Sequence, residues 1–368
     1  NSSKEWSNFS SLSAFIKLGT RVNRLLTPSF SATNLLPEIA YALLTDTTIG
    51  AGASIGTQQV DKDRMTLAAQ FCQANKFTWD GVISDRINLR EWIYEQAGYC
   101  LLDFTILGGR FSLVPSVPYN TNYVINPEGK PAVKALFTDG NIRNMKVTWL
   151  SPEERRLFKA TCLWRQDKDN GFPETKVVSV RLADFEGGSE GDPEETFDMS
   201  GWCTTQEHPL TFARYALKLR QLVDHSVTFE TTPQAAMNLA PGEYFRLVSE
   251  VTHTSRFNNG SISEDGIIQS QDLLNGSYSI LYWVPGTTEV QSGTLTATNG
   301  RTTQTVLFGT VFALNNTTTV NRLYKVETLS YGEDGLVDVA ASYAPLTDRG
   351  TLAVLDWGDD EMFVIETY

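Results

Sequence analysis

The chain has 368 residues, of which 41% are hydrophobic and 11% aromatic. This composition is ordinary for a globular protein and excludes a disordered one, and the length predicts two or three domains. Its 43 acidic and 30 basic residues give a formal charge of -13, which disfavours nucleic-acid binding because that function needs a basic footprint. No apolar run approaches the roughly 18 residues of a membrane-spanning helix, so no stable membrane insertion is expected.

The first third of the chain has helical periodicity. Between Asn34 and Gly98, three segments repeat apolar residues at the spacing of one helix face. Two strand-like runs then flank Gly108-Gly109, a pair of residues typical of a tight β-hairpin turn. Three helices and a hairpin predict an α+β domain over residues 1–118.

The middle of the chain predicts a barrel-like sheet with one helix. Alternating apolar residues predict a strand from Met145 to Trp149. Residues 151–156 have features of a helix start, but period-two alternation follows, which favours a turn there and a strand at 157–165. That strand is expected to pair antiparallel with the preceding one. The apolar face of residues 209–223 predicts a flanking helix, and the β-barrel is expected to span residues 119–249.

Beyond residue 250 the sequence is wholly β in character. Four steps that accept positive φ angles are expected to form turns: Asn259-Gly260, Asn275-Gly276, Asn299-Gly300 and Asp334-Gly335. The clearest strands are Tyr278–Tyr282, Thr305–Phe312, Leu323–Leu329 and Leu336–Ala340. A β-barrel or sandwich is expected over residues 250–368, and the same pattern allows one domain to be built from discontinuous pieces of chain. The fold class is therefore multidomain α+β, mainly β.

One stretch of the middle region is strongly acidic and contains no lysine or arginine. Its acids are Asp184, Glu186, Glu190, Asp192, Glu194, Glu195 and Asp198. Such a run is most often a solvated loop. The sharper hypothesis is that these residues line a channel or an interface and repel passing DNA, and the two interpretations are compatible.

Catalytic motifs in the sequence lack the context that their chemistry needs. Ser54 lies in Gly-Ala-Ser-Ile-Gly, which matches the nucleophile elbow of serine hydrolases, but the required buried strand before it and helix after it are not predicted. His208, His225 and His253 have no metal-ligand neighbour at helical or strand spacing. The adjacent acids Asp359-Asp360-Glu361 are more typical of exposed charge than of a glycosidase pair. No cofactor or metal is expected.

The four cysteines are widely separated and include no Cys-x-x-Cys pair. They are Cys72, Cys100, Cys162 and Cys203. This spacing argues against a zinc ribbon or a disulfide framework and favours buried free thiols.

Several segments carry a family resemblance through their order and spacing. In chain order they are NLLPEIAYALLTD, VDKDRMTLAAQFCQANKFTWDGVI, NLREWIYEQAGYCLLDFTILGGRFSLV, LFTDGNI, MKVTWLSPEERR, the Trp202-Cys203 region with the helix after it, Pro241-Gly242-Glu243, Leu323–Glu327 and Glu333–Val339. Together they resemble the tip attachment (J-type) proteins, or central tail hubs, of long-tailed non-contractile phages and the related hubs of gene transfer agents.

The resemblance implies a homotrimer that closes the distal end of a tail tube beneath a ring of distal tail protein. It also implies contacts with other tail-tip and fibre proteins and with the tape measure protein, and a place at the tail tip of a virion assembled in the host cytoplasm. DNA would only pass through, and no enzymatic activity is expected. The family's fibronectin-like modules do not appear before Tyr368, so host recognition is not expected of this chain, and its N-terminal hub portion is expected to be absent or shortened.

Two alternatives belong to other functional classes. A tail-tip hydrolase of cell wall or polysaccharide would depend on groups such as Ser54 and Asp103. A receptor-binding module would need exposed aromatic patches, for which Trp283 and Trp357 are the candidates.

Overall fold

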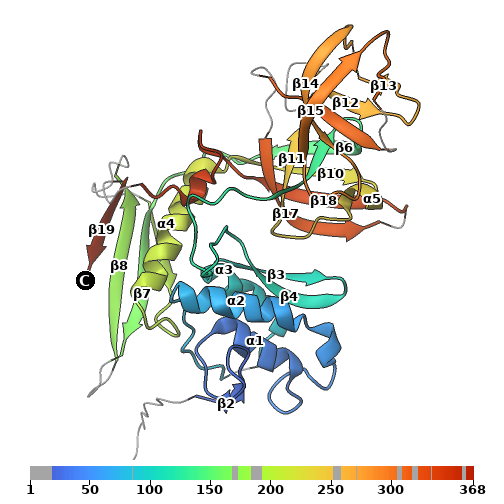
Figure 1. The fold of residues 1–368 in the computed structure, drawn as a ribbon. Coiled ribbons are helices and arrows are strands. Elements are labelled where there is room, and N and C mark those ends of the chain that lie inside the picture. The colour runs from blue at the N-terminus through green and yellow to red at the C-terminus, as the bar shows by residue number, and fades with distance from the viewer. Residues whose placement is uncertain are drawn as a thin grey trace, which may run out of the picture.

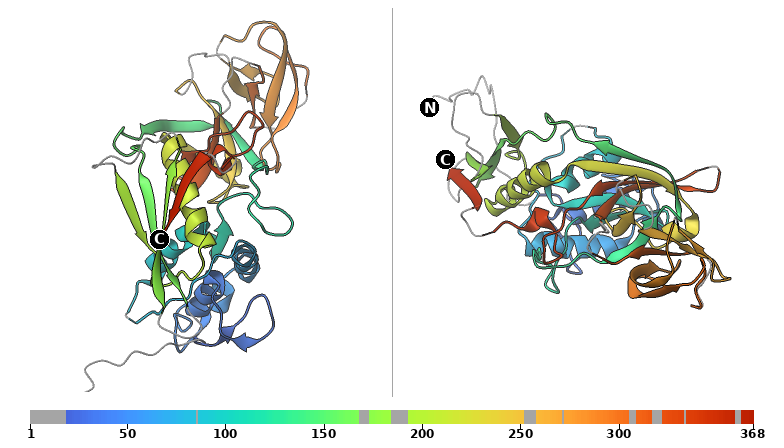
Figure 2. Two further views of the ribbon diagram at one scale, coloured as in Figure 1. Left: turned by 90° about the vertical axis from the view of Figure 1, so that its left-hand side faces the viewer. Right: turned by 90° about the horizontal axis from the view of Figure 1, so that it is seen from above.

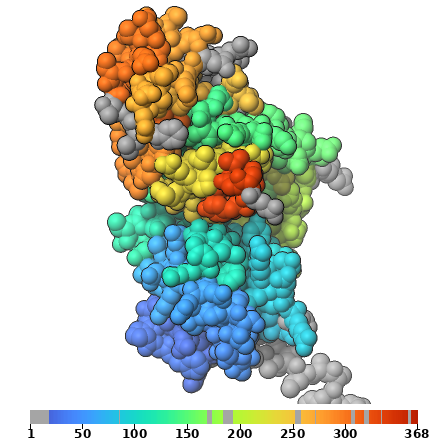
Figure 3. Space-filling model, turned by 90° about the vertical axis from the view of Figure 1, so that its right-hand side faces the viewer, coloured from blue at the N-terminus to red at the C-terminus, as the bar shows by residue number. Residues whose placement is uncertain are grey.

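The computed structural model describes residues 19–84, 86–167, 173–183, 193–251, 258–270, 272–304, 309–316, 322–332, 334–358 and 362–368. The fold is mixed α+β and mainly β, as predicted: N-terminal helices precede three larger sheets, of six, five and four strands. The helices lie at one end, the six-stranded sheet in the middle and the five-stranded sheet at the other end (Figures 1 and 3). The four-stranded sheet lies to one side (Figure 1).

The N-terminal part contains the three predicted helices and the predicted hairpin. Its elements are β1 (Val22–Asn23), β2 (Phe30–Ser31), α1 (Leu36–Thr45), η1 (Thr57–Gln59), α2 (Lys62–Ala74), α3 (Leu89–Tyr99), β3 (Leu102–Leu107) and β4 (Arg110–Pro115). Gly108 and Gly109 both have positive φ angles, +55° and +76°. A two-residue turn of this kind matches the twist of the strands that it joins.

A buried carboxylate fixes the start of this part to the first helix. Glu38, in the first turn of α1, is inaccessible to solvent. It accepts hydrogen bonds from the backbone amides of Leu25 and Leu26, at 2.8 and 3.1 Å, and from the side chains of Arg24 and Thr33. These four donors, one of them charged, offset the cost of burying the carboxylate.

The six-stranded sheet forms the centre of the molecule. Its strands are β5 (Val133–Thr138), β6 (Ile142–Trp149), β10 (His225–Thr231), β11 (Tyr244–Val248), β17 (Arg322–Tyr331) and β18 (Val337–Tyr343). They follow the order β5-β11-β17-β18-β10-β6, in which only the β5–β11 pair is parallel. The short helix α5 (Pro233–Ala236) contributes to the core of this sheet.

The predicted barrel takes the form of a curled half-barrel. Its two edge strands, β5 and β6, are separated in the chain by only residues 139–141, so the edges meet at that corner although no ladder joins them. Strands before and after residue 250 share this sheet. The core is thus assembled from discontinuous pieces, and the predicted limits of the three domains stay a prediction.

The four-stranded sheet carries the predicted helix. Its strands are β7 (Lys159–Gln166), β8 (Glu174–Leu182), β9 (Glu194–Asp198) and β19 (Phe363–Thr367), in the order β19-β8-β7-β9. Helix α4 (Glu207–Leu222) lies against one face of this sheet (Figure 2) and contacts β7 and β8. The predicted turn at 151–156 is confirmed, but the predicted pairing of the strands around it is wrong. Strand β6 pairs with β10, whereas β7 pairs with β8 and β9 in another sheet.

The five-stranded sheet is formed entirely from the region after residue 250. Its strands are β12 (Asn259–Ile262), β13 (Ile268–Gln269), β14 (Gly276–Trp283), β15 (Gln291–Ala297) and β16 (Thr310–Leu314). They follow the order β13-β12-β16-β14-β15. The 3-10 helix η2 (Ala353–Leu355) precedes β19 and contacts α4.

The four predicted turn steps have different outcomes. Asn299-Gly300 and Asp334-Gly335 are turns, as expected, with positive φ angles at Asn299, Gly300 and Gly335, and Asn275-Gly276 lies at the start of β14. The prediction for Asn259-Gly260 is wrong, because these residues lie inside β12. A Cβ atom on Gly260 would come within 2.3 Å of the carbonyl oxygen of Gln269. Glycine is needed at this position for the close approach of β13.

Candidate functional site

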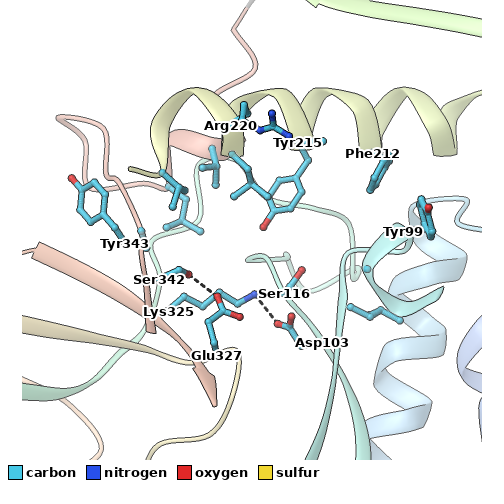
Figure 4. Close-up of a pocket in the computed structure, with 18 of the residues that line it drawn as sticks. Tyr99, Asp103, Ser116, Phe212, Tyr215, Arg220, Lys325, Glu327, Ser342 and Tyr343 are labelled. Carbon is cyan, nitrogen blue, oxygen red and sulfur yellow. Dashed lines mark hydrogen bonds and ion pairs between the residues drawn. The ribbon is translucent and has the colours of Figure 1, made fainter. Parts of the chain in front are cut away.

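A cavity lies where α4, the N-terminal part and the central sheet meet. Its volume is about 840 Å³, within the usual range for a ligand pocket. Helix α4 forms one side, α3 and β3 another, and the ends of β17 and β18 a third (Figure 4). The N-terminal part, the central sheet and the helix that packs on the four-stranded sheet therefore contribute to one site.

The walls of the cavity are largely apolar and include several aromatic rings. Helix α4 buries Ala213 and Leu217 and presents Phe212, Tyr215 and Leu219 to the cavity. Because residues three and four positions apart share a helix face, one helix can serve both surfaces. The ring of Tyr99, from α3, lies 5.0 Å from that of Phe212 between centroids, so the wall continues across the two elements.

The floor of the cavity is polar and contains an ion pair. The ammonium group of Lys325, on β17, lies 2.8 Å from Oδ2 of Asp103, on β3, in an arrangement outside normal hydrogen-bond geometry. Burial alone would lower the pKa of Lys325, but the carboxylates of Asp103 and Glu327 help to hold that pKa well above its usual range. Lys325 is therefore a permanent cation, and the pair joins the hairpin to the central sheet.

Further contacts attach this floor to its surroundings. The Tyr244 hydroxyl donates to the carbonyl oxygen of Ser116 at 3.2 Å, and burial raises the pKa of Tyr244, so the hydroxyl keeps its proton. Gly242 has a φ of +90°, and a Cβ atom there would lie 3.1 Å from Asp103 Oδ2. Ser342 donates to Glu327 at 2.6 Å. Neither histidine nor cysteine is among the described residues that line the cavity.

The predicted acidic residues are placed only in part. Asp184, Glu186, Glu190 and Asp192 lie outside the described residues. The other three are on β9 and have local partners: Glu194 pairs with Lys159 at 3.6 Å, Glu195 pairs with Arg220 at 3.0 Å, and Asp198 accepts from Ser200. Glu195 also lines the cavity. That these acids face a channel stays a prediction.

Among the described residues, the motifs that suggested catalysis lack the neighbouring elements and groups that their chemistry needs. Ser54 lies in a turn between α1 and η1, so the element directly before it is a helix and not a strand. His208 is buried, and its ring bonds to the Thr78 amide and the Tyr99 carbonyl. His225 is buried between Asp224 and the Tyr324 hydroxyl. His253 and the acids at 359–361 lie outside the described residues.

Three further features concern metal ligands, cysteines and membrane-spanning helices. The described residues contain no group of three or more potential metal ligands. All four cysteines are buried and free, and burial raises the pKa of Cys162 to about 12. In the described part of the chain, no helix combines the length and apolar character needed to cross a membrane.

The aromatic candidates for receptor binding are not the exposed ones. Trp283 is fully buried and Trp357 is half-buried. Trp149 and Tyr331 are the exposed aromatics of the central sheet, at 59% and 72%. The sequence reasoning also missed Lys325 and Glu327, although their spacing within a predicted strand places both on one face.

No protein-family model and no curated protein matches the chain. Three solved structures have a distant structural similarity to it: the virion of a native gene transfer agent particle (TM-score 0.35, 12% identity, 77% of this chain and 47% of that one), a tail protein from Neisseria meningitidis MC58 (0.31, 11%, 74% and 59%), and a 43 kDa tail protein of prophage MuSo2 from Shewanella oneidensis (0.30, 10%, 71% and 56%). The chain spans about half the length of the proteins that it matches.

Proposed function

We propose that the chain is a structural component of a phage-type tail: a homotrimeric hub at the tail tip that closes the distal tube and gates genome passage. Its partners would be copies of itself, a distal tail protein ring, other tip and fibre proteins and the tape measure protein. It would catalyse no reaction. The family resemblance of the sequence supports this proposal, and the exposed edge of the central sheet carries it.

Strand β6 is an eight-residue edge. The Leu150 amide donates to the Asp224 carbonyl at 2.9 Å, one step beyond the pair Trp149–His225. Because alternate residues of an antiparallel strand direct their backbone groups to opposite sides, Thr148 and Lys146 bond to β10, whereas the backbone groups of Val147 and Trp149 point outward. No described strand pairs with this outer side. Such an edge is a template for a strand of a neighbouring chain.

Charge agrees with a role around a DNA channel. The chain has a formal charge of -13, so most surfaces that it contributes to a lumen would repel DNA rather than retain it. The edge itself carries two exposed cations, Arg143 and Lys146. They deter indiscriminate strand pairing and favour an acidic partner strand.

The first test is the mass of the purified chain, by light scattering coupled to size exclusion. We expect a species three times the mass of the 40.9 kDa chain. Val147→Pro removes an outward amide while keeping the bonds to β10, since proline is tolerated on the free side of an edge strand. Val147→Ala loses similar side-chain packing but keeps the amide, and is the matched control.

Assembly should be lost with Val147→Pro and retained with Val147→Ala, while circular dichroism shows both variants folded. A monomer under all conditions would contradict the trimeric hub. A trimer that Val147→Pro leaves intact would contradict the role of β6, and the contacts would then be sought elsewhere on the surface.

A further inference from the structure

The cavity beside α4 has an excess of negative charge that its own residues do not neutralise. Its lining includes five acidic and two basic side chains: Glu95, Asp103, Glu154, Glu195 and Glu327 against Arg220 and Lys325. The two cations are already paired, Lys325 with Asp103 and Arg220 with Glu195. Among the described residues, the other three carboxylates form no ion pair, although Glu327 is close enough to Lys325 to raise its pKa.

Glu327 is the carboxylate best placed to receive a ligand. It lies on β17 beside the floor of the cavity, and Ser342 donates to it at 2.6 Å (Figure 4). A single hydrogen bond leaves most of the acceptor capacity of a carboxylate free. Glu327 is therefore oriented by a neighbour and still available.

The walls would favour the same kind of ligand. Phe212 lies 5.0 Å from Tyr99 and 5.1 Å from Phe197 between ring centroids, so aromatic rings form a continuous surface. Aromatic faces attract cations as well as apolar groups. A neutral apolar occupant would desolvate the carboxylates without compensation, and an anion would be repelled.

We propose that this cavity is a docking site for an extended segment of a partner protein, in which an arginine or lysine is flanked by apolar side chains. The apolar side chains pack against the wall formed by α3 and α4, and the cation bonds to Glu327. A cavity of about 840 Å³ has room for a few side chains, which suits a short segment better than a whole domain. The site lies within one copy of the chain and does not depend on the trimer.

Titration calorimetry at low ionic strength, with the full chain, tests this proposal. The probe is the capped pentapeptide acetyl-Phe-Leu-Arg-Leu-Phe-amide, and its counterpart with glutamate at the centre is the charge control. Glu327→Gln removes one carboxylate, and Ala216→Trp fills the cavity from α4. Glu264→Gln, an exposed acid that does not line the cavity, is the matched control variant.

We expect the arginine peptide to bind and the glutamate peptide to bind at least about tenfold more weakly, the ratio that corresponds to one charge-assisted hydrogen bond. Glu327→Gln should weaken binding of the arginine peptide by roughly the same factor, Ala216→Trp should abolish it, and Glu264→Gln should leave it unchanged. Hydrogen exchange should show protection of α4 and β17 when the peptide is bound.

Equal binding of the two peptides, no binding at millimolar concentration, or undiminished binding to a folded Ala216→Trp variant would overturn the proposal. If Ala216→Trp instead lowers the mass of the assembly, the occupant is a segment of a second copy and the separate partner is disproved. If the chain is monomeric but peptide binding behaves as expected, the hub proposal fails and the docking site stands.

Discussion

The two edge strands of the central sheet, β5 and β6, differ in whether another part of the chain covers them. The last four residues of β5 are buried, and the strand is covered by the five-stranded sheet, whose β16 and β12 contact it. Five of the eight residues of strand β6 are exposed to solvent. The chain thus covers one edge with its own later segment, whereas no described strand pairs with the outer side of the other.

The difference shows that whether an edge strand is free to pair depends on which other segments cover it. Both strands form a ladder along their inner side, and each ladder has one register irregularity. The five-stranded sheet, which covers β5, is attached at the corner of the central sheet. There Thr138 Oγ1 donates to the Gly260 carbonyl at 3.4 Å, and Asp139 contacts Asn259. No described contact of this kind exists along the outer side of β6. The outer side of a free edge is a template for strand pairing, which is why we propose β6 as an assembly surface.

The largest expected effect is a difference in the free energy of unfolding between substitutions on the two edge strands. Phe137, on β5, is inaccessible and lies 4.9 and 5.0 Å from the rings of Phe229 and Phe245. Phe137→Ala should lower the free energy of unfolding by about 3–5 kcal/mol, because it leaves a cavity in a close-packed core. Trp149→Ala, on β6, should cost under about 1 kcal/mol because that side chain is mostly exposed. Urea denaturation measures both, and equal losses would show that β6 is covered too.

A smaller loss of stability is expected from a substitution of Asp139, at the corner where the five-stranded sheet is attached next to β5. Asp139 accepts hydrogen bonds from the Ser249 hydroxyl, the Glu250 amide and the Asn259 side chain, at 2.5, 2.9 and 3.0 Å. Asp139→Ala should cost about 1–2 kcal/mol, since the carboxylate is partly solvated but its donors lose a common acceptor. Hydrogen exchange should show faster exchange in β5 and β12 and unchanged exchange in β6. Uniform loosening of both edges would contradict a local role.

Local patterns in the sequence predicted the elements that short-range physics determines. The hairpin around Gly108-Gly109 and the helix at 209–223 depend on turn geometry and helical spacing, and both are present. The free buried cysteines also follow from local apolar context. Fold class could therefore be predicted from sequence alone.

The pairing of distant segments could not be predicted in this way. Strands β6 and β7 are neighbours in the chain and look like a hairpin, yet they belong to different sheets, because β10 competes successfully for β6. The cavity depends on Asp103 and Lys325, which are 222 positions apart and meet only after the sheets pack. Period-two alternation states which face of a strand is buried but not which strand lies beside it.

The smallest expected effect concerns pH at the exposed edge. His225, opposite Trp149, lies between the rings of Trp149 and Tyr343, at centroid distances of 4.5 and 4.8 Å. Burial lowers the pKa of His225 below its usual value near 6.5, and Arg322 adds to this, although Asp224 opposes both. The neutral ring donates to Asp224 and accepts from the Tyr324 hydroxyl, whose pKa is raised to about 12 by burial.

Because the folded-state pKa of His225 is depressed, its contribution to stability is fully present above pH 6.5 and is lost as the pH falls toward the folded-state value. The free energy of unfolding should therefore decrease between pH 7 and 5, and less so in His225→Gln. Trp149→Ala uncovers the ring and should return its pKa toward 6.5, whereas a neighbouring strand on β6 should lower it further. An NMR titration of the His225 ring measures this directly. A pKa above 6.5 would mean that Asp224 outweighs burial, and stability would then be lost as the pH rises.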